Sequence, residues 1–487
     1  MMNTMLIIPW EVLLILLPLF GGILSFVFKK IAKVVAVATL FTTLIFVFMI
    51  ALKLLETGAY YHLVGGWDAP LGINLYVDGL SLLMLGLTAL IGVLVTLYST
   101  KYFTQESSIL FWPLYLFMTA GLNALFLSQD IFNFYVTLEL IGLASVALST
   151  LSSTKEALTG AMRYLLVTLA GSLAYLLGVA LLYHGFGSVD ISILSQKIEP
   201  TPVVWAAMGL MSAGLLLKSA LFPFHFWLPP AHANAPAPIS AILSALIIKA
   251  SIYIQLRLVL YLFMPLGDIY LEVLFGVLGT MAIVWGSVQA LLQTRLKLLI
   301  AYSTVAQIGY IFIAFSLAIG GVPIAWNALV YLILSHALAK SAMFLVAGNL
   351  LHFCGHDRIT DLDRLAQRLP LSITAFALAG VSIIGLPISG GFIAKWFLLE
   401  AALIDENWIF ILVILVGGLL AAAYIFKVLG FAFTKAPQSH EGEMLSPYME
   451  FTPLILAILS IVIGFFAIPI LSLVEIGNPF NIAGVRP

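Results

Sequence analysis

The chain has 487 residues, of which 62% are hydrophobic and only 9% are charged, and its mean hydropathy is +1.14. An average soluble domain has about 25% charged residues, so this composition excludes a soluble protein and predicts a polytopic membrane protein. The net charge of −1 excludes a basic face for nucleic acid. The one cysteine, Cys354, excludes disulfides and thiolate-held clusters within the chain. We therefore expect no cofactor and no metal in this chain.

Fourteen apolar segments have roughly the length of about 20 residues that a membrane span requires. The first segment lacks a small-residue cleavage site, so it is expected to be a retained span rather than a signal peptide. The predicted spans lie near 6–27, 34–54, 76–99, 110–128, 131–150, 159–184, 203–225, 238–262, 270–291, 298–319, 326–351, 371–399, 408–433 and 452–474.

Basic residues are divided unequally between the loops. Loops after odd-numbered spans hold eleven, whereas the even-numbered loops and the C-terminal tail hold three: Lys53, Lys197 and Arg486. The positive-inside rule then places the odd-numbered loops in the cytoplasm and both termini outside. The eleven basic residues are Lys29, Lys30, Lys33, Lys101, Lys155, Arg295, Lys297, Arg358, Arg364, Arg368 and Lys435. One polar loop, 357–368, fits either a short amphipathic helix or a solvated loop.

Two spans are interrupted by residues that break helices. The seventh contains Pro223 after Lys218, and the twelfth contains Gly385 and Pro387 before Lys395. Such breaks are tolerated where the freed backbone groups face protein or water. Interrupted helices at matching places in two halves are typical of inverted-repeat transporters. The fold class is therefore predicted as all-α, with about 14 transmembrane helices and two inverted five-helix repeats with broken helices 7 and 12. The predicted units are residues 1–109 (three N-terminal helices), 110–265 (helices 4–8), 266–433 (helices 9–13) and 434–487 (helix 14 and tail).

Five charges lie deep inside these apolar spans: Glu139, Lys218, Lys249, Lys340 and Lys395. A charge at the bilayer centre costs roughly 2.5–3.5 kcal/mol on insertion scales, so four lysines would cost about 10–14 kcal/mol. That sum is comparable with the stability of an ordinary domain. Intramembrane ionisable residues therefore predict an ion or proton path.

Glu139 and Lys218 are candidates for a switchable pair. A mid-span carboxylate needs a partner cation or a proton, and the alternative is a structural ion pair. Two opposite charges about 4 Å apart at an effective dielectric of 20 interact by roughly 4 kcal/mol. A carboxylate that approaches or retreats could thus make the lysine hold or release a proton.

The other candidates lie on later spans. His336 and Lys340 are four residues apart and share a helix face, and imidazole can relay protons; the alternative is a histidine satisfied by Ser335 or Ser341. Lys249 is mid-span, and Arg257 is expected to reach toward the membrane surface. Three further residues are candidates for proton access, namely His225 and His232 beside the first break and Glu400 beyond the second, although Glu400 also fits a simple marker of the outer interface.

No enzyme motif is present: the chain has no phosphate-binding P-loop, no zinc-protease HExxH and no dinucleotide glycine fingerprint. We therefore predict no active site in the chain itself. Two alternatives to a proton path stay open. One is a stand-alone secondary transporter that binds its substrate at the broken helices, and the other is a quinone or enzyme pocket near Trp227 and Trp396.

The most specific stretches are FNFYVTLELIGLAS, LLLKSALFPFHFWLPPAHANAPAPISAILSALIIKA, SHALAKSAMF and GLPISGGFIAKW. With them the chain resembles, over nearly its whole length, the antiporter-like proton-conducting subunits of respiratory complex I, Mrp sodium/proton antiporters and membrane-bound hydrogenases. It looks most like the Mrp D subunit and the matching subunit of hydrogenase or ferredoxin-linked complexes. The resemblance implies a proton path through Glu139, Lys218, Lys249, His336, Lys340 and Lys395.

The resemblance also implies partners. We expect a proton-translocating subunit of a multisubunit respiratory-type or Mrp-type complex in the cytoplasmic membrane, either an oxidoreductase or an antiporter. Other membrane subunits, and iron–sulfur or nickel–iron peripheral subunits, are the expected protein partners. Protons are the expected cargo, and sodium is a second candidate ion.

Overall fold

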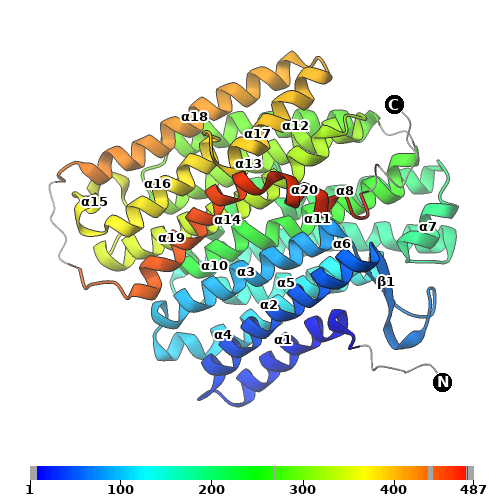
Figure 1. The fold of residues 1–487 in the computed structure, drawn as a ribbon, viewed down its shortest axis with the longest axis horizontal. Helices are drawn as coiled ribbons and strands as arrows, with labels where there is room; N and C mark the ends of the chain where they lie inside the picture. Colours follow the sequence, from blue (N-terminus) through cyan, green and yellow to red (C-terminus); the bar gives the residue numbers. More distant parts are fainter. Residues whose placement is uncertain (1–7, 267–268, 437–441, 479, 481–487) are drawn as a thin grey trace.

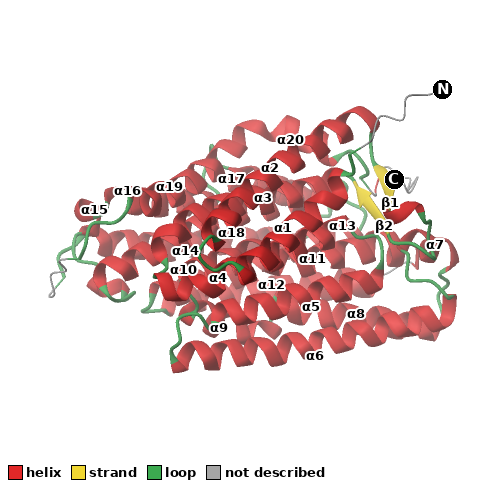
Figure 2. Ribbon diagram, turned by 90° about the horizontal axis from the view of Figure 1, so that it is seen from below, coloured by secondary structure: helices red, strands yellow, loops and turns green. Residues whose placement is uncertain are grey.

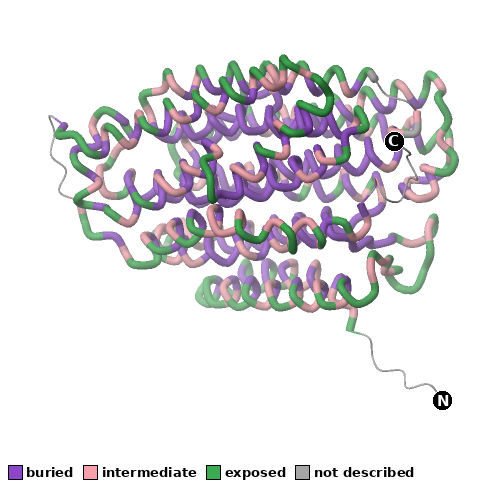
Figure 3. The backbone as a smooth tube through the Cα atoms, turned by 45° about the horizontal axis from the view of Figure 1, so that its top comes forward, coloured by how far each residue is buried: buried purple, intermediate pink, exposed green. Residues whose placement is uncertain are grey.

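Every long apolar segment is helical in the part of the chain that the structure describes, because a helix satisfies its own backbone hydrogen bonds where a bilayer offers no water. The computed structural model describes residues 8–266, 269–436, 442–478 and 480. The helices run side by side along one common direction (Figure 1). Figure 3 shows that buried residues fill the interior of this bundle and that exposed residues lie on its outside.

The N-terminal half contains the following helices. Those before the first predicted repeat are α1 (Trp10–Val27), α2 (Ala32–Thr57) and α3 (Gly79–Tyr102). Those that follow are α4 (Gln105–Leu127), α5 (Ile131–Ser149), α6 (Lys155–Phe186), α7 (Ile191–Lys197), α8 (Pro202–Ser219), η2 (Phe224–Trp227), α9 (Leu228–Asn234), α10 (Ala237–Ile242), η3 (Leu243–Ile247), α11 (Ile248–Leu258), η4 (Val259–Phe263) and η5 (Met264–Leu266).

The C-terminal half repeats the same kind of long helices. Its elements are α12 (Ile269–Leu292), α13 (Leu296–Ile319), α14 (Ile324–Cys354), η6 (Ile359–Asp361), α15 (Leu365–Arg368), α16 (Pro370–Ile384), α17 (Gly390–Ile404), α18 (Trp408–Phe433), α19 (Pro447–Val462), η7 (Ile463–Phe466) and α20 (Ala467–Val474). The loop at 357–368 thus contains only two short helical pieces and no continuous amphipathic helix, and it is not a simple solvated loop either, because Ile359, Leu362 and Leu365 are buried.

Both predicted breaks are present. The seventh span ends as α8 at Ser219 and resumes at η2 and α9, so this broken span reaches Asn234 rather than residue 225. The twelfth span divides into α16 and α17, each of 15 residues. Thirteen helical segments of the described chain are long and apolar enough to cross a membrane, and the divided twelfth span makes the fourteenth. The predicted fold class is therefore confirmed.

The bounds of the predicted units stay a prediction. The boundary at 109/110 falls inside α4, which begins at Gln105. The boundary near residue 265 lies beside residues 267–268, which are outside the described part of the chain.

One region departs from the all-helical expectation. Residues between α2 and α3 form an antiparallel hairpin of β1 (Tyr60–Leu63) and β2 (Asn74–Val77), in which Tyr60 pairs with Val77, and the short helix η1 (Val64–Gly66) follows β1. The hairpin and α7 lie at the same end of the bundle (Figure 1).

Many of the basic loop residues meet at the other end, here called the basic end. Lys33 donates to the Thr100 carbonyl, and Arg295 forms a bridge with Arg358 in the next basic loop. At the hairpin end, the Gly79 amide donates to Ile476 after α20, and Glu11 at the start of α1 accepts from Tyr60. The first and last described helices therefore begin and end on one side, as an even number of spans requires. Residues 1–7 and 481–487 lie outside the described chain, so the position of the termini stays a prediction.

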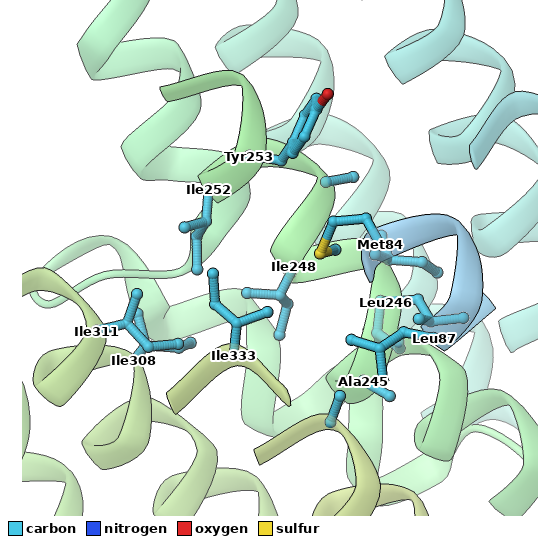
Figure 4. Close-up of a cluster of buried hydrophobic side chains, with 14 of the residues drawn as sticks. Met84, Leu87, Ala245, Leu246, Ile248, Ile252, Tyr253, Ile308, Ile311 and Ile333 are labelled. Carbon is cyan, nitrogen blue, oxygen red and sulfur yellow. The ribbon is translucent and has the colours of Figure 1, made fainter. Parts of the chain in front are cut away.

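Three spans form the centre of the bundle: the run from α10 to η4, α13 and α14. In the most apolar stretch of each of these three spans, 100%, 89% and 100% of the residues are buried, respectively. Figure 4 shows part of this packing, where Ile248 and Ile252 lie beside Ile308, Ile311 and Ile333. The predicted charged residues of spans eight and eleven are thus surrounded by tightly packed apolar side chains. Figure 2 shows α5, α6 and α8 along one flank of the bundle.

Candidate functional site

Glu139 of α5 and Lys218 of α8 form the predicted pair. Their side chains approach to 3.3 Å between Lys218 Nζ and Glu139 Oε1, and the exposed fractions are 6% for the lysine and 21% for the glutamate. The Ser172 hydroxyl of α6 donates to the same carboxylate oxygen. Lys218 lies in the last turn of α8, where the negative end of the helix dipole favours a cation. The carboxylate therefore has two donors from two helices.

A small cavity lies between Lys218 and α11. It measures about 10 Å³ and is lined by both Lys218 and Ser251, together with Tyr164 and Thr168. A polar cavity of this size is about the minimum that holds one water molecule. It gives the first pair a polar connection toward the helix that carries Lys249.

Lys249 lies between two π-helical segments, η3 and η4, of the same span. Such segments use wider i→i+5 hydrogen bonds and are frequent at functional sites. The Lys249 ammonium donates to the Ser244 carbonyl within η3 at 2.5 Å. The side chain is fully buried, and no carboxylate of the described chain lies within 4.0 Å of it. Its charge is thus balanced by dipoles alone.

The second partner of Lys249 is His336 of α14. The distance between Lys249 Nζ and His336 Nδ1 is 2.5 Å. A charged lysine donates to a neutral imidazole here, and a neutral lysine accepts from a protonated one, so the contact holds with the shared proton on either side. Ser335 and Ser341 donate instead to backbone carbonyls of their own helix. The interpretation of His336 as a histidine satisfied by these hydroxyls is therefore wrong.

Lys340 lies one turn after His336 on α14 and reaches α13. Its ammonium donates to the Ser303 hydroxyl and, at 3.2 Å, to the Ile300 carbonyl. The side chain is fully buried, and within the described residues no acidic group forms an ion pair with it. It therefore depends on groups without a formal negative charge, as Lys249 does.

Lys395 of α17 occupies the second break. Its ammonium donates to the last carbonyls of α16, Ile383 at 3.0 Å and Ile384 at 2.9 Å, and lies 4.5 Å from the Tyr310 ring centroid. The break leaves these carbonyls without helical partners, and the helix C-terminus attracts a cation. Gly385 has φ +85°, and a Cβ there would lie 2.7 Å from the Lys395 side chain. Glycine is thus required for the lysine to reach the helix end.

Polar residues of α13 were not identified from the sequence. Ser303, Gln307 and Tyr310 follow at spacings of four and three, so they lie on one helix face. Ser303 contacts Lys340, and the Gln307 amide donates to Ile383 O at 3.4 Å. This stripe connects Lys340 with Lys395. Its helical spacing inside a buried apolar span was the signal that could have revealed it.

The three candidate access residues behave differently. His232 of α9 is fully buried, its ring stacks on Phe344 at 4.6 Å, and neither ring nitrogen has a hydrogen-bond partner among the described residues. His225 of η2 stacks on Phe222 at 5.4 Å. Glu400 is exposed on α17, and no hydrogen bond within the described chain joins it to Lys395. The structure therefore brings His232 near the buried charges and leaves Glu400 apart.

The two tryptophans proposed for an apolar pocket lie in different environments, one buried and one exposed. Trp227 is buried against Tyr164, with ring centroids 4.6 Å apart, whereas Trp396 is 57% exposed on the outside of α17. They line no common cavity among those found in the described chain. No group of three or more potential metal ligands exists within the described residues.

Arg257 does not reach the membrane surface, so that expectation is wrong. Its guanidinium is 2% exposed and makes two bonds of 2.6 Å to the carboxylate of Asp78, the N-cap residue of α3. Tyr253 and Tyr261 accept two further hydrogen bonds from it. A bidentate carboxylate partner inside the protein removes the need to reach water. This pair joins α11 to α3 rather than extending the line of lysines.

Comparison with known protein families gives two matches. The model described as "NADH:quinone oxidoreductase/Mrp antiporter, TM" matches residues 128–421, which include every candidate site residue. The model described as "NADH-Ubiquinone oxidoreductase (complex I), chain 5 N-terminus" matches residues 65–110.

Individual relatives extend these matches. The chain is 37% identical over 388 residues to the N subunit of the NADH-quinone oxidoreductase of Desulforudis audaxviator, and the alignment covers 78% of this chain and 76% of the relative. It is 28% identical over 487 residues to the D subunit of the Na(+)/H(+) antiporter of Alkalihalophilus pseudofirmus, with coverage of 96% and 95%.

Solved structures show the same fold. A chain of the membrane-bound sulfane sulfur reductase, described as an archaeal respiratory membrane complex, superposes with a TM-score of 0.89 at 28% identity and covers 96% of this chain and 97% of that one. A chain of the Mrp complex from Dietzia sp. gives a TM-score of 0.89 at 24% identity and covers 98% of both chains.

Proposed function

Because the chain belongs to the family of transmembrane subunits of NADH:quinone oxidoreductases and Mrp antiporters, we propose that it is a proton-translocating subunit of a multisubunit membrane complex. The proposed path runs from Glu139 and Lys218 through Lys249 and His336 to Lys340 and Lys395. The basic end of the bundle is proposed to face the cytoplasm, as the positive-inside rule predicts.

The observation that carries this proposal is a series of separate polar contacts that follow one another through the centre of the bundle. Lys249 contacts His336, Lys340 contacts Ser303, and Gln307 and Lys395 share the Ile383 carbonyl. A proton moves readily between groups within hydrogen-bond distance, or through one intervening water. Stability alone does not account for such a succession, because replacing buried charges with apolar residues is often neutral or stabilising.

The pair of Glu139 and Lys218 supplies a place where this movement is controlled. At 3.3 Å the carboxylate strongly favours a protonated lysine. If Glu139 turns away, Lys218 loses that attraction and gives its proton to a water in the neighbouring cavity, from which it passes toward Lys249. Glu139 is the more exposed of the two partners, so it is the one with room to move.

The test replaces Lys218 or Glu139 with alanine and follows formation of a pH gradient in membrane vesicles that contain the assembled complex. We expect at least a tenfold loss for either variant. Lys427→Met is a control, because Lys427 is another lysine within a span that donates hydrogen bonds, here to the Leu291 and Gln293 carbonyls, but lies off the proposed path. Native rates in an assembled Lys218→Ala complex would overturn the proposal.

The partners of the chain follow from its relatives. The two relatives are named as subunits, and the two superposed structures belong to complexes. We propose that any redox centre lies on iron–sulfur or nickel–iron peripheral subunits, since a single cysteine cannot hold a cluster. Sodium is proposed as a second transported ion, in line with the name of the antiporter relative.

Purification of the complex separates these possibilities. Co-purifying iron–sulfur or nickel–iron subunits would identify a redox-driven pump, whereas small hydrophobic subunits alone would identify an Mrp-type antiporter. A single purified chain that transports ions in liposomes without any partner would instead support the stand-alone transporter.

A further inference from the structure

A polar cavity opens at the basic end, directly beside the start of α13. It measures about 600 Å³ and is lined by Asn234 at the end of α9 and Ala235 and Pro236 after it, by Arg295 and Lys297, and by exposed residues such as Thr154 near α6. The exposed rim connects the cavity with the surface. We refer to this cavity, lined by these six residues among others, as the vestibule.

The floor of the vestibule is held closed by two cations. Lys297 is 2% exposed, and its ammonium donates to the Ala235 carbonyl. Arg295 donates to the Ala233 carbonyl at 3.3 Å and to Asp357 at 2.9 Å. These bonds fasten the end of α9 and the residue that follows it to the start of α13. Arg295 has a carboxylate partner, whereas the Lys297 ammonium has none within 4.0 Å in the described part of the chain.

His232 lies immediately behind this floor, three residues before Ala235. It is fully buried, and both ring nitrogens lack a hydrogen-bond partner in the described chain. Buried polar groups are rarely left in this state, so each one needs an explanation. Its electrostatic neighbours are Lys297 on the vestibule side and Lys340 and Lys249 on the other. His232 therefore stands between the vestibule and the proposed proton path.

We propose that Lys297 is a positioning residue that closes the vestibule over His232. While its ammonium holds the Ala235 carbonyl, it blocks water from the imidazole, and its positive charge opposes a proton there. When it releases that carbonyl, vestibule water reaches one ring nitrogen of His232 and gives it a proton. The other ring nitrogen then passes a proton, through an intervening water, to the Lys249–His336 pair once that pair has lost its own proton along the path, so the imidazole returns to its neutral form. This inference rests on the proposed function, because it assigns the entry point of that path.

The experiment measures access rather than transport. Cys354 is the only cysteine of this chain, so Cys354→Ser provides a background in which His232→Cys is the single reporter on this subunit, and labelling is read on this subunit after the subunits are separated. A membrane-impermeant methanethiosulfonate reagent is applied to the basic end in vesicles that contain the complete complex. We expect slow labelling with Lys297 in place and at least tenfold faster labelling after Lys297→Met, with Lys297→Arg restoring slow labelling.

Two controls separate gating from general loosening. Lys427→Met removes a half-buried lysine that also donates to backbone carbonyls but lies outside the vestibule, and it is expected to leave labelling of the reporter slow. A reporter at Ser145, buried on α5 against Tyr164, is expected to stay slow in every variant. If Lys297→Met does not assemble, Lys297→Gln, which removes the charge, serves in its place.

Equal labelling with and without Lys297 would overturn the gate, whatever the transport rate. Faster labelling of both reporters would overturn it too, since that result shows loosened packing. Failure of the proposed function is a separate result, because it would appear as native proton transport in Lys218→Ala while the labelling still responds to Lys297.

Discussion

Gln307 and Lys395 donate to the same backbone oxygen, the Ile383 carbonyl, at 3.4 Å and 3.0 Å. This carbonyl lies at the end of α16, where the break in the twelfth span leaves it free of a helical partner. One uncharged side chain of α13 is thus joined to a lysine of α17 through the backbone of a third helix. Between Lys340 and Lys395, the proposed path therefore passes from α13 to α17 at the Ile383 carbonyl.

Gln307→Leu should interrupt the proposed path without disturbing the packing. Leucine fills a similar volume but offers no hydrogen-bonding group between Ser303 and Ile383. We expect proton transport to fall about tenfold or more, since positioned proton-transfer groups contribute factors on the order of 10² to 10⁴. The measurement is pH-gradient formation in vesicles with equal amounts of complex. Gln255→Leu is the matched control, because Gln255 is an equally buried glutamine that donates to Ser212 at 3.0 Å.

Lys249 and His336 should behave as one unit. Their 2.5 Å contact means that removing either partner leaves nothing for the other to exchange a proton with. We expect Lys249→Met and His336→Leu each to lower transport at least tenfold and the double variant to fall little below the worse single one. Two multiplying losses would contradict this prediction. His184→Leu, an exposed histidine on α6, serves as control and should transport normally.

The charged residues could be identified from the sequence, because a charge within a long apolar segment stands out without any knowledge of the fold. Lys218 and Lys395 are charges within apolar spans that also contain helix-breaking residues, so both position and break could be predicted. Uncharged polar residues are harder to interpret, because a serine or glutamine within a span often has a purely structural role, such as a hydrogen bond to the backbone. Ser303 and Gln307 were therefore missed, although their spacing placed them on one face.

Apart from the pair of Glu139 and Lys218, contacts between distant segments could not be predicted. Arg257 lies near the end of its span, where an arginine usually reaches the interface. Its partner Asp78 is 179 positions away, and only the folded chain brings the two together. The hairpin of β1 and β2 was missed for a similar reason, since two strands of four residues give a weak pattern on their own.

The buried pair of Arg257 and Asp78 should matter for stability rather than transport. Removing one partner leaves an uncompensated buried charge, so Arg257→Met and Asp78→Asn should each destabilise the chain by about 3–5 kcal/mol. Arg257→Lys should not rescue, because an ammonium cannot reproduce the two-pronged contact. Thermal unfolding of the purified complex measures this.

An exposed pair provides the comparison. Arg358 and Asp361 form an ion pair with side-chain exposures of 72% and 24%. Exposed pairs contribute about 0–1 kcal/mol, so Arg358→Met should hardly change the unfolding temperature. Equal effects at Arg257 and Arg358 would show that burial of the first pair is not what makes it important.

Asp130 should make the folded chain less stable as the pH rises. A carboxylate with a lowered pKa would have the opposite effect on stability. It is the N-cap of α5, just before the span, and its side chain accepts from the Asn133 amide at 2.7 Å. Burial, and to a lesser extent the nearby Asp190, raises the pKa of Asp130 above its ordinary value of 3.8. The folded state therefore binds a proton more readily than the unfolded state, and stability falls as the pH rises from about 4 through the raised pKa.

Asp130→Asn tests this directly, because asparagine caps a helix about as well as aspartate but carries no charge. At pH 7 the variant should unfold at the same or a slightly higher temperature than the native chain, and the difference should vanish near pH 4. Asp130→Ala removes the cap and should cost about 1 kcal/mol at both pH values. A loss of stability in Asp130→Asn that appears only at pH 7 would mean that the charge stabilises the helix start, which would reverse the sign argued from its burial.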